Sequence, residues 1–169
     1  MRRLSKIIIS VLIILSNISC DQITKDQARD HICEQEVIHV IEDNFILTKV
    51  ENTGAALSLG ENLSPNLKIL LLQIMPILVL VFMFVYVVRE RTISKINVLA
   101  FSFIIGGGIG NIYDRILYGS VTDFMYLELG SWHTGIFNMA DVSVVIGTAL
   151  LLINLLILEL NKYHLKVNW

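Results

Sequence analysis

The chain has 169 residues, of which 54% are hydrophobic and 17% are charged. With a mean hydropathy of +0.68, it is too apolar for an ordinary soluble domain, so we interpret it as an integral membrane protein. The formal net charge of −2, without a basic patch, argues against a nucleic-acid partner.

The first apolar segment, residues 5–21, has basic residues at its start and Cys20 at its end. This pattern describes a membrane-spanning helix, but it also describes a secretory or lipoprotein signal peptide that is cleaved. Asn17 stands three residues before Cys20, where a lipoprotein signal usually carries a leucine-like residue. We therefore favour a retained helix. Cys20 could pair with Cys33 on the oxidising side of a membrane, although neither their separation nor their surroundings argue for a disulfide.

A small β element is predicted between residues 36 and 62. The runs "EVIHVI" and "NFILTKVE" are rich in β-branched residues and partly alternate, and Glu42-Asp43-Asn44 between them reads as a turn. "GAALSLG" is a candidate for a further strand. Because so small a sheet is marginal in water, it must lean on the helices or on the bilayer surface.

Three further apolar segments follow, at residues 68–88, 95–113 and 139–159. The run 69–88 is interrupted only by Gln73 and Pro76, and it is long enough to cross a hydrocarbon core of about 30 Å. The other two contain asparagines but are also near spanning length. Together with the first segment they predict an all-α integral membrane protein in one domain, residues 1–169: a four-transmembrane-helix bundle with a small extracytoplasmic antiparallel β element.

The charges predict the topology of the four spans. The N-terminus, the connection 89–95 and the tail beyond Leu158 would share one side, and their only acids are Glu90 and Glu159. By the positive-inside rule this side is the cytoplasm, so the loops 21–68 and 113–138 face outward. The basic residues in these three segments are Arg2, Arg3, Lys6, Arg89, Arg91, Lys95, Lys162 and Lys166.

Two aspartates flank the last two spans at their outer ends: Asp123 follows the third span and Asp141 begins the fourth. If these helices pack side by side, the carboxylates face each other, and one would hold a proton because two close carboxylates do not both ionise readily. Such a pair supplies an acid and a base that can activate water against a peptide carbonyl. Alternatively, Asp141 is a helix-start residue behind Asn138 and Asp123 is a solvated loop acid.

A polar cluster, "GGGIGNIYDR", places Asn111, Asp114 and Arg115 at the end of the third span, and its glycines permit close helix packing. Arg115 could pair with Asp114, or it could hold a backbone carbonyl or a lipid headgroup, and the residues leave both possibilities open. Asp21, at the end of the first span, and Asn52 fall at the same depth.

Four clusters in this order, "DQITK", "NTGAALS", "GGGIGNIYDR...GSVTDF" and "FNMAD", resemble those of the lipoprotein signal peptidase family, also called signal peptidase II. The resemblance extends from the first span to the fourth. It implies a membrane-embedded aspartic endopeptidase of the bacterial cytoplasmic membrane, which cleaves diacylglyceryl-modified prolipoproteins before their lipidated cysteine. It also implies a β-sheet cradle and an outer helix or loop over an active site at the outer face.

By the resemblance, the catalytic pair is Asp123 and Asp141, and Asn52, Arg115 and Asn138 are expected to orient the substrate backbone or the pair. The supporting polar residues that the resemblance implies are Asp21, Asn52, Gly54, Asn111, Arg115 and Asn138, with Asp114 beside them as the runner-up for a catalytic role. The sequence departs from the family pattern at Cys20, Gly135 and Val142.

The resemblance implies no metal or organic cofactor, and the partners it implies are lipidated prolipoproteins and membrane lipid. We expect a monomer, although the sequence itself does not indicate the oligomeric state. An inactive relative or a membrane scaffold is the main alternative function. A proton or solute pathway is a further alternative, since carboxylates within membranes also mark transporters. It is less favoured because the acids gather at one face rather than near the middle of the bilayer.

Overall fold

The structure is a computed structural model that describes residues 3–34, 36–42 and 44–167. Within these residues, four helices are long and apolar enough to cross a membrane. They are α1 (Arg3–His31), the stretch Pro65–Arg89, α4 (Lys95–Leu117) and the part of α5 (Met139–Val167) that ends at Asn161. The expected spans 5–21, 68–88, 95–113 and 139–159 each lie inside one of them. The predicted four-helix membrane fold is therefore confirmed.

The N-terminal helix α1 runs without a break through Cys20, and it is packed into the bundle on both sides of that residue. Near its start, Lys6 Nζ donates to the Glu90 carbonyl at 2.6 Å. Further along, Ser143 Oγ of α5 donates to Asn17 Oδ1 at 2.6 Å. Cleavage before Cys20 would remove both contacts, which supports the retained helix. The thiols of Cys20 and Cys33 are free and exposed.

The second span combines α2 (Pro65–Ile69), a wider π-helical turn at Leu70–Ile74 and α3 (Met75–Arg89). The wide turn lies where Pro76 has no backbone N–H to donate and its ring crowds the preceding turn. Gln73 in this turn donates to the Arg115 carbonyl at 3.3 Å. This bond ties the outer end of the second span to α4.

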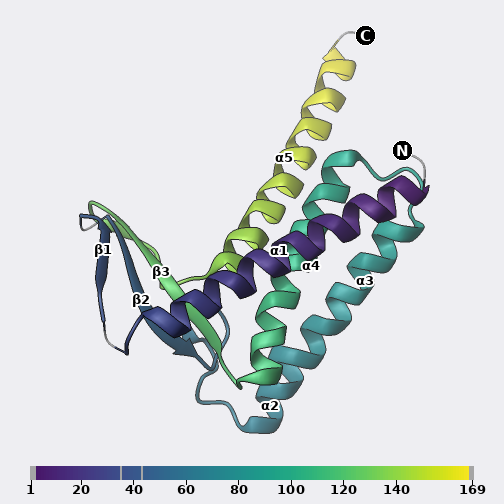
Figure 1. Cartoon of the computed structure of the whole chain (residues 1–169). Coiled ribbons are helices and arrows are strands. Elements are labelled where there is room, and N and C mark those ends of the chain that lie inside the picture. Colours follow the sequence, from purple (N-terminus) through teal and green to yellow (C-terminus); the bar gives the residue numbers. More distant parts are fainter. Residues whose placement is uncertain (1–2, 35, 43, 168–169) are drawn as a thin grey trace.

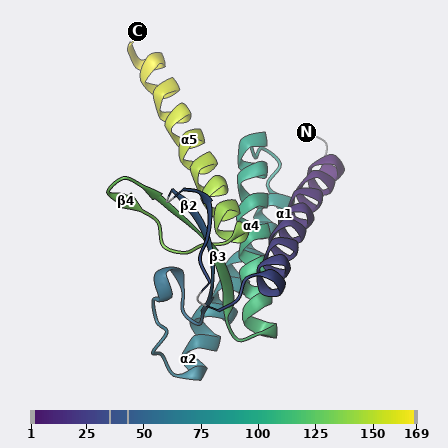
Figure 2. The same cartoon turned by 60° about the vertical axis from the view of Figure 1, so that its left-hand side comes forward.

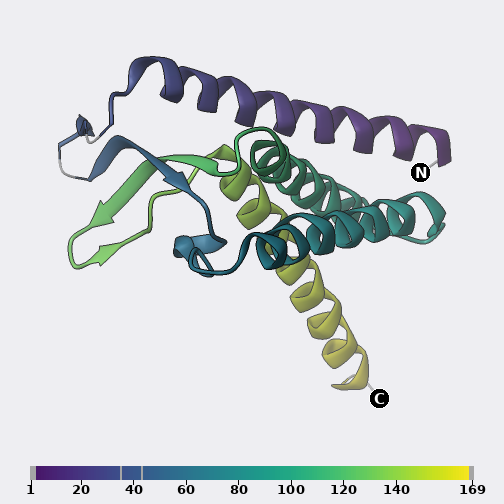
Figure 3. The ribbon, with the colours of Figure 1, turned by 90° about the horizontal axis from the view of Figure 1, so that it is seen from below.

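The central helix is α4, which packs against α1, α3 and α5 (Figures 1 and 2). Its contact with α5 is close because two glycines lie against backbone: Gly107 faces the Ala140 carbonyl, and Gly147 of α5 faces the Ala100 carbonyl. Small residues permit such an approach in a bilayer, where lipid tails compete with apolar side chains for contact. The second half of α5 projects away from the other helices (Figures 1 and 3).

A four-stranded antiparallel sheet, in the order β1-β2-β3-β4, lies at the end of the bundle away from both chain ends (Figures 1 and 3). The predicted region 36–62 supplies β1 (Ile38–Ile41) and β2 (Phe45–Asn52). The other strands, β3 (Val121–Leu129) and β4 (Trp132–His133), come from the loop between α4 and α5. Instead of the further strand considered at "GAALSLG", residues 56–58 form a short 3-10 helix, and Leu57 and Ser58 have positive φ angles of 55° and 56°.

The sheet is held on α1 by an apolar cluster of Ala28, Ile32 and Phe124, against which Leu47 and Met125 also pack. Pairing of β2 with β3 sets Asn52 opposite Val121 and Val50 opposite Asp123. The sheet thereby places Asn52, from the first outer loop, close to Asp123, from the loop that follows α4.

The end of the bundle away from the sheet carries the chain ends and the connection between α3 and α4 (Figure 1). Basic residues of the predicted cytoplasmic side, such as Arg3 and Lys95, lie in these segments. Arg2 and the side chains of Lys162 and Lys166, which also entered that prediction, lie outside the described part of the chain.

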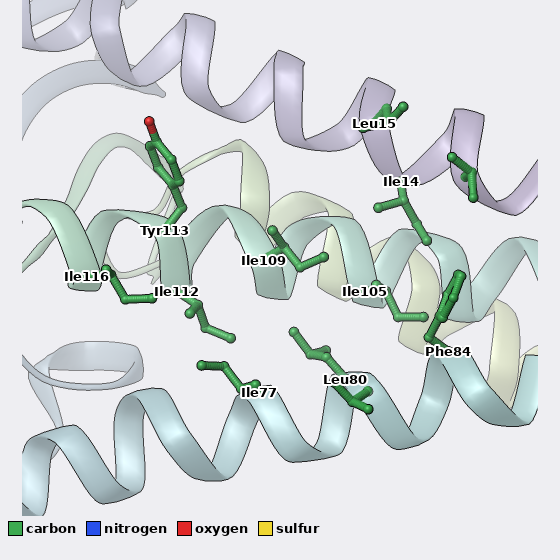
Figure 4. A pocket seen from close by; sticks show the side chains of 12 residues that line it. Ile14, Leu15, Ile77, Leu80, Phe84, Ile105, Ile109, Ile112, Tyr113 and Ile116 are labelled. Atoms are coloured by element: carbon green, nitrogen blue, oxygen red, sulfur yellow. The ribbon is translucent and has the colours of Figure 1, made fainter.

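A cavity of about 540 Å³ lies between α1, α3 and α4 and is lined almost entirely by hydrocarbon (Figure 4). Ile14, Leu80, Ile105 and Ile112 face it, and the same four residues form the apolar core of this part of the bundle. Within the described residues, it shares no lining residue with the cavity of the site considered below.

The close packing of α4 and α5 can be tested by Gly147→Ala. The added methyl group would lie 2.6 Å from the Ala100 carbonyl oxygen, so we expect the free energy of unfolding to fall by about 1–3 kcal/mol. Thermal denaturation of the purified protein in detergent measures this loss. The neighbouring change Thr148→Ala, at an exposed position, should stay within about 0.5 kcal/mol of the wild type. An unchanged melting temperature for Gly147→Ala would contradict the packing.

Candidate active site

Asp123 and Asp141 come together at the junction of the sheet and the helices. Asp123 lies on β3, and Asp141 lies in the first turn of α5. Both line one cavity of about 760 Å³, together with Asn52, Asn111 and Arg115. The side chain of Asp123 is buried, with only 5% of the residue exposed. The alternative that Asp123 is a solvated loop acid is therefore wrong.

Asparagine side chains connect the two carboxylates. Asn138 Nδ2 donates to Asp123 Oδ1 at 2.6 Å and to Asn111 Oδ1 at 3.1 Å. Asn111 Nδ2 in turn donates to Asp141 Oδ1 at 2.9 Å. The other oxygen of Asp123 accepts from Asn52 Nδ2 at 3.0 Å. Neutral donors therefore occupy the space around the pair, and they stabilise negative charge without neutralising it.

Asn138, the residue before α5, caps the first turn of this helix and fixes Asp141 through the backbone. The Asn138 side-chain oxygen accepts from the Asp141 N–H at 3.0 Å, and Asp141 Oδ2 accepts from the Asn138 N–H at 3.2 Å. This reciprocal arrangement is a capping box. Asp141 is thus a helix-start residue, as the alternative interpretation has it, but it also faces the cavity beside Asp123.

The environment of Asp123 favours a protonated carboxyl group. Burial, opposed by the hydrogen bond from Asn52 and reinforced by the charge of Asp141, raises its pKa from 3.8 to about 6. Desolvation and a like charge both penalise the ionised form. A carboxyl group of this kind can carry a proton in mildly acidic to neutral conditions, which is a requirement of acid catalysis.

Arg115 holds the loop that follows β2. Its Nη2 donates to the Gly54 carbonyl at 2.8 Å, and the Gly54 N–H donates to Asn52 Oδ1 at 2.9 Å. Of the two possibilities that the sequence left open, Arg115 therefore binds a backbone carbonyl. Arg115 Nε is buried and has no hydrogen-bond partner in the described structure.

Asp114 does not pair with Arg115, contrary to the partnership considered from the sequence. Its carboxylate forms ion pairs with Lys25 at 2.9 Å and with Arg29 at 3.1 Å. It is fully buried and is not among the side chains that line the cavity. The helical turn directs Asp114 toward α1 and the neighbouring Arg115 toward the cavity, so a catalytic role for Asp114 is not supported.

Asp21 likewise lies behind the cavity. Its Oδ1 accepts from the backbone N–H of Ala140 at 2.9 Å, and its Oδ2 accepts from Lys25 at 2.8 Å. Asp21 therefore joins α1 to the start of α5.

Sequence reasoning missed Lys25 and Arg29, which belong to the same buried ionic cluster. Asp21, Lys25 and Arg29 recur every four residues and so share one face of α1. Their recurrence near the end of an apolar segment was the signal that could have identified them. Arg29 Nε also donates to Thr122, the residue before Asp123, at 2.9 Å.

The remaining wall of the cavity is hydrocarbon from two membrane-spanning segments. Leu71, Leu72 and Pro76 contribute from the second span, and Val142 and Val145 contribute from α5. Gly135 and Leu57 line it from two different loops, and a β-carbon at Gly135 would collide with the Leu57 side chain. Within the described part of the chain, no three His, Cys, Asp or Glu side chains gather as a metal-binding group.

Comparisons with known proteins find similar sequences over most of this chain. The family described as "Signal peptidase (SPase) II" matches residues 13–157. A lipoprotein signal peptidase of Clostridium novyi (strain NT) is 35% identical over 147 residues, which is 86% of this chain and 96% of that protein. One of Pelodictyon phaeoclathratiforme is 39% identical over 153 residues, covering 83% and 86% of the two chains.

A solved structure, titled "Bacterial membrane enzyme structure by the in meso method at 2.3 A resolution", has the same fold. It superposes with a TM-score of 0.81 at 30% sequence identity and covers 90% of each chain.

The protonation of Asp123 predicts how stability depends on pH. Because its pKa of about 6 in the folded protein exceeds its ordinary value, the folded state binds more protons, and stability falls as pH rises from about 4 to about 6. Asp123→Asn removes this ionisation. We expect its melting temperature to match that of the wild type near pH 4 and to exceed it at pH 7. Asp30→Asn, at an exposed position, should keep the wild-type dependence, and the same dependence in Asp123→Asn would refute the assignment.

Proposed function

The chain belongs to the signal peptidase II family, and we propose that it removes signal peptides from diacylglyceryl-modified prolipoproteins with Asp123 and Asp141 as its catalytic pair. Family membership makes the chain a multi-pass membrane peptidase. The main support for the aspartic mechanism is that both carboxylates line one cavity, whose opposite wall consists of apolar side chains from membrane-spanning segments.

The two aspartates have unequal surroundings, which suggests a role for each. Asp123 is the buried carboxyl group with the raised pKa of about 6, so we assign it the proton. Asp141 then acts as the base that takes a proton from the attacking water. Asp123 polarises the scissile carbonyl and afterwards protonates the leaving nitrogen. Water adds to the carbonyl carbon, the C–N bond breaks, and the products are a carboxylic acid and an amine.

The rest of the cavity is suited to a lipidated peptide. Leu71, Leu72 and Val145 offer an apolar wall on which a signal segment or acyl chains would lose contact with water. Arg115 lines the same cavity, and its buried Nε has no partner in the described structure. The Arg115 guanidinium thus places a positive charge in the cavity wall, while its Nη2 holds the Gly54 carbonyl.

We assign the chain to the bacterial cytoplasmic membrane, with both termini in the cytoplasm and the active site at the outer face. The support is the placement of charge: basic residues such as Arg3 and Lys95 lie in the segments at the end of the bundle away from the sheet and the aspartates. The substrate's modified cysteine would reach the aspartates from the outer leaflet.

The catalytic pair is tested by Asp123→Asn and Asp141→Asn. Each variant should stay folded and lose about 10⁴-fold or more in kcat, because residues that act as one unit are individually indispensable. The assay is cleavage of a diacylglyceryl-modified prolipoprotein by the protein in detergent, with the unmodified precursor alongside. Cleavage by the wild type of the modified form alone establishes the substrate class. An active Asp→Asn variant removes that aspartate from the mechanism.

Asn52→Ala tests the assignment of the proton to Asp123. Asn52 donates to the ionised carboxylate and so lowers the Asp123 pKa; without it that pKa should rise further. Activity that requires protonated Asp123 falls as pH rises through this pKa, so the alkaline limb of the kcat/KM profile should move to higher pH while kcat falls partially. Asn66→Ala, at an exposed position, should leave the profile in place. If the alkaline limb of the Asn52→Ala profile stays at the wild-type pH or moves to lower pH, Asp123 is not the acid.

A further inference from the structure

Lys25 lies on α1, outside the cavity, but it is one contact away from the catalytic pair. The residue is fully buried, and no side chain of α1 lines the cavity within the described residues. The Lys25 ammonium has three N–H bonds and three partners: Asp21 Oδ2 at 2.8 Å, Asp114 Oδ2 at 2.9 Å and Asn111 Oδ1 at 2.9 Å. The two carboxylates are its ion-pair partners, whereas Asn111 connects it to the site.

The contact with Lys25 determines which way the Asn111 amide faces. An ammonium group only donates hydrogen bonds, so Asn111 must turn its oxygen toward Lys25. Asn138 Nδ2, which is also a donor, meets the same oxygen at 3.1 Å. The amide group of Asn111 is planar, so its NH₂ points the opposite way, to Asp141 Oδ1 at 2.9 Å.

The reversed amide would be unfavourable on every side. Its NH₂ would face the Lys25 ammonium and the Asn138 NH₂, and its oxygen would face the Asp141 carboxylate. Two donors, Lys25 and Asn138, enforce the observed orientation of the Asn111 amide. Of the two, Lys25 imposes the larger penalty on reversal, because hydrogen bonds from a charged donor are roughly twice as strong as those from a neutral donor. Without Lys25 this larger penalty is lost.

We propose that Lys25 is a positioning residue of the peptidase: through Asn111 it keeps an N–H donor, rather than a carbonyl oxygen, against Asp141. Asp141 then has one carboxylate oxygen held by Asn111 and the other by the Asn138 backbone. A carboxylate held on both oxygens keeps a fixed geometry toward the attacking water, and small displacements of such groups cost large factors in rate. This inference rests on the proposed function, since it gives a role to Asp141 as the base.

The test is a double-mutant cycle between Lys25 and Asn111. Lys25→Met should lower kcat about 10- to 100-fold and leave KM within about twofold, because no side chain of α1 lines the cavity. Asn111→Ala should produce a similar loss. If Lys25 acts through Asn111, adding Lys25→Met to Asn111→Ala should lower kcat by no more than about threefold further. Full additivity of the two losses would overturn the proposal.

The control is Arg29→Met, which removes the other cation of the same cluster. Arg29 contacts Asp114 at 3.1 Å and Thr122 at 2.9 Å, and within the described residues it forms no hydrogen bond with Asn111. It should lower the melting temperature and keep kcat within about threefold of the wild type. If Arg29→Met lowers kcat as much as Lys25→Met does, the effect belongs to the ionic cluster as a whole and the proposal fails.

Lys25→Met leaves two buried carboxylates with one fewer cation and could prevent folding. The charge-balanced variant Lys25→Met/Asp114→Asn removes one charge of each sign and should fold, with the same loss of kcat. Normal kcat in this variant, with an active wild type, overturns the role of Lys25 and leaves the proposed function intact. Failure of the wild type itself to cleave the lipidated precursor overturns the proposed function and, with it, this inference.

Discussion

The ion pairs of Lys25 with Asp21 and Asp114 are the contacts on which the rest of the site depends. In a bilayer, helices gain little from the hydrophobic effect when they associate, so close packing and polar contacts determine their arrangement. The Lys25–Asp114 pair joins α1 to α4, Lys25 also holds Asp21 within α1, and Asp21 accepts a hydrogen bond from the backbone N–H of Ala140 at the start of α5. Burying such charges is costly and seldom adds net stability. Their benefit here is that three helices meet in one register.

The sheet positions the site residues that the helices do not carry. Asp123 and Asn52 lie far apart in sequence, in two different outer loops, and the antiparallel pairing of β2 with β3 brings them to hydrogen-bonding distance. An apolar cluster around Phe124 fixes the sheet on α1. Asp123 is therefore placed by a strand and Asp141 by a helix, and neither depends on a flexible loop for its position.

Neutral asparagines surround the carboxylate pair, and this choice has a chemical consequence. A lysine or arginine in hydrogen-bonding contact with both aspartates would favour two ionised groups and remove the acid from the pair. Amide donors orient the oxygens while the raised pKa of Asp123 persists. The charged residues of the ionic cluster lie one layer behind, where one of them, Lys25, determines the orientation of Asn111.

The sequence alone determined the four spans and the β1–β2 hairpin region, because apolar length and β-branched runs are local properties. Motif order indicated the family and singled out the two aspartates that line one cavity. Only the tertiary structure determined which polar side chains contact each other. Asp114 pairs with Lys25 and Arg29 on α1, not with its neighbour Arg115, since adjacent residues on a helix point in different directions. The strand β3 was hidden in a loop because its pairing partner, β2, is remote in sequence. Contacts between distant segments depend on how the helices pack, which no local pattern encodes.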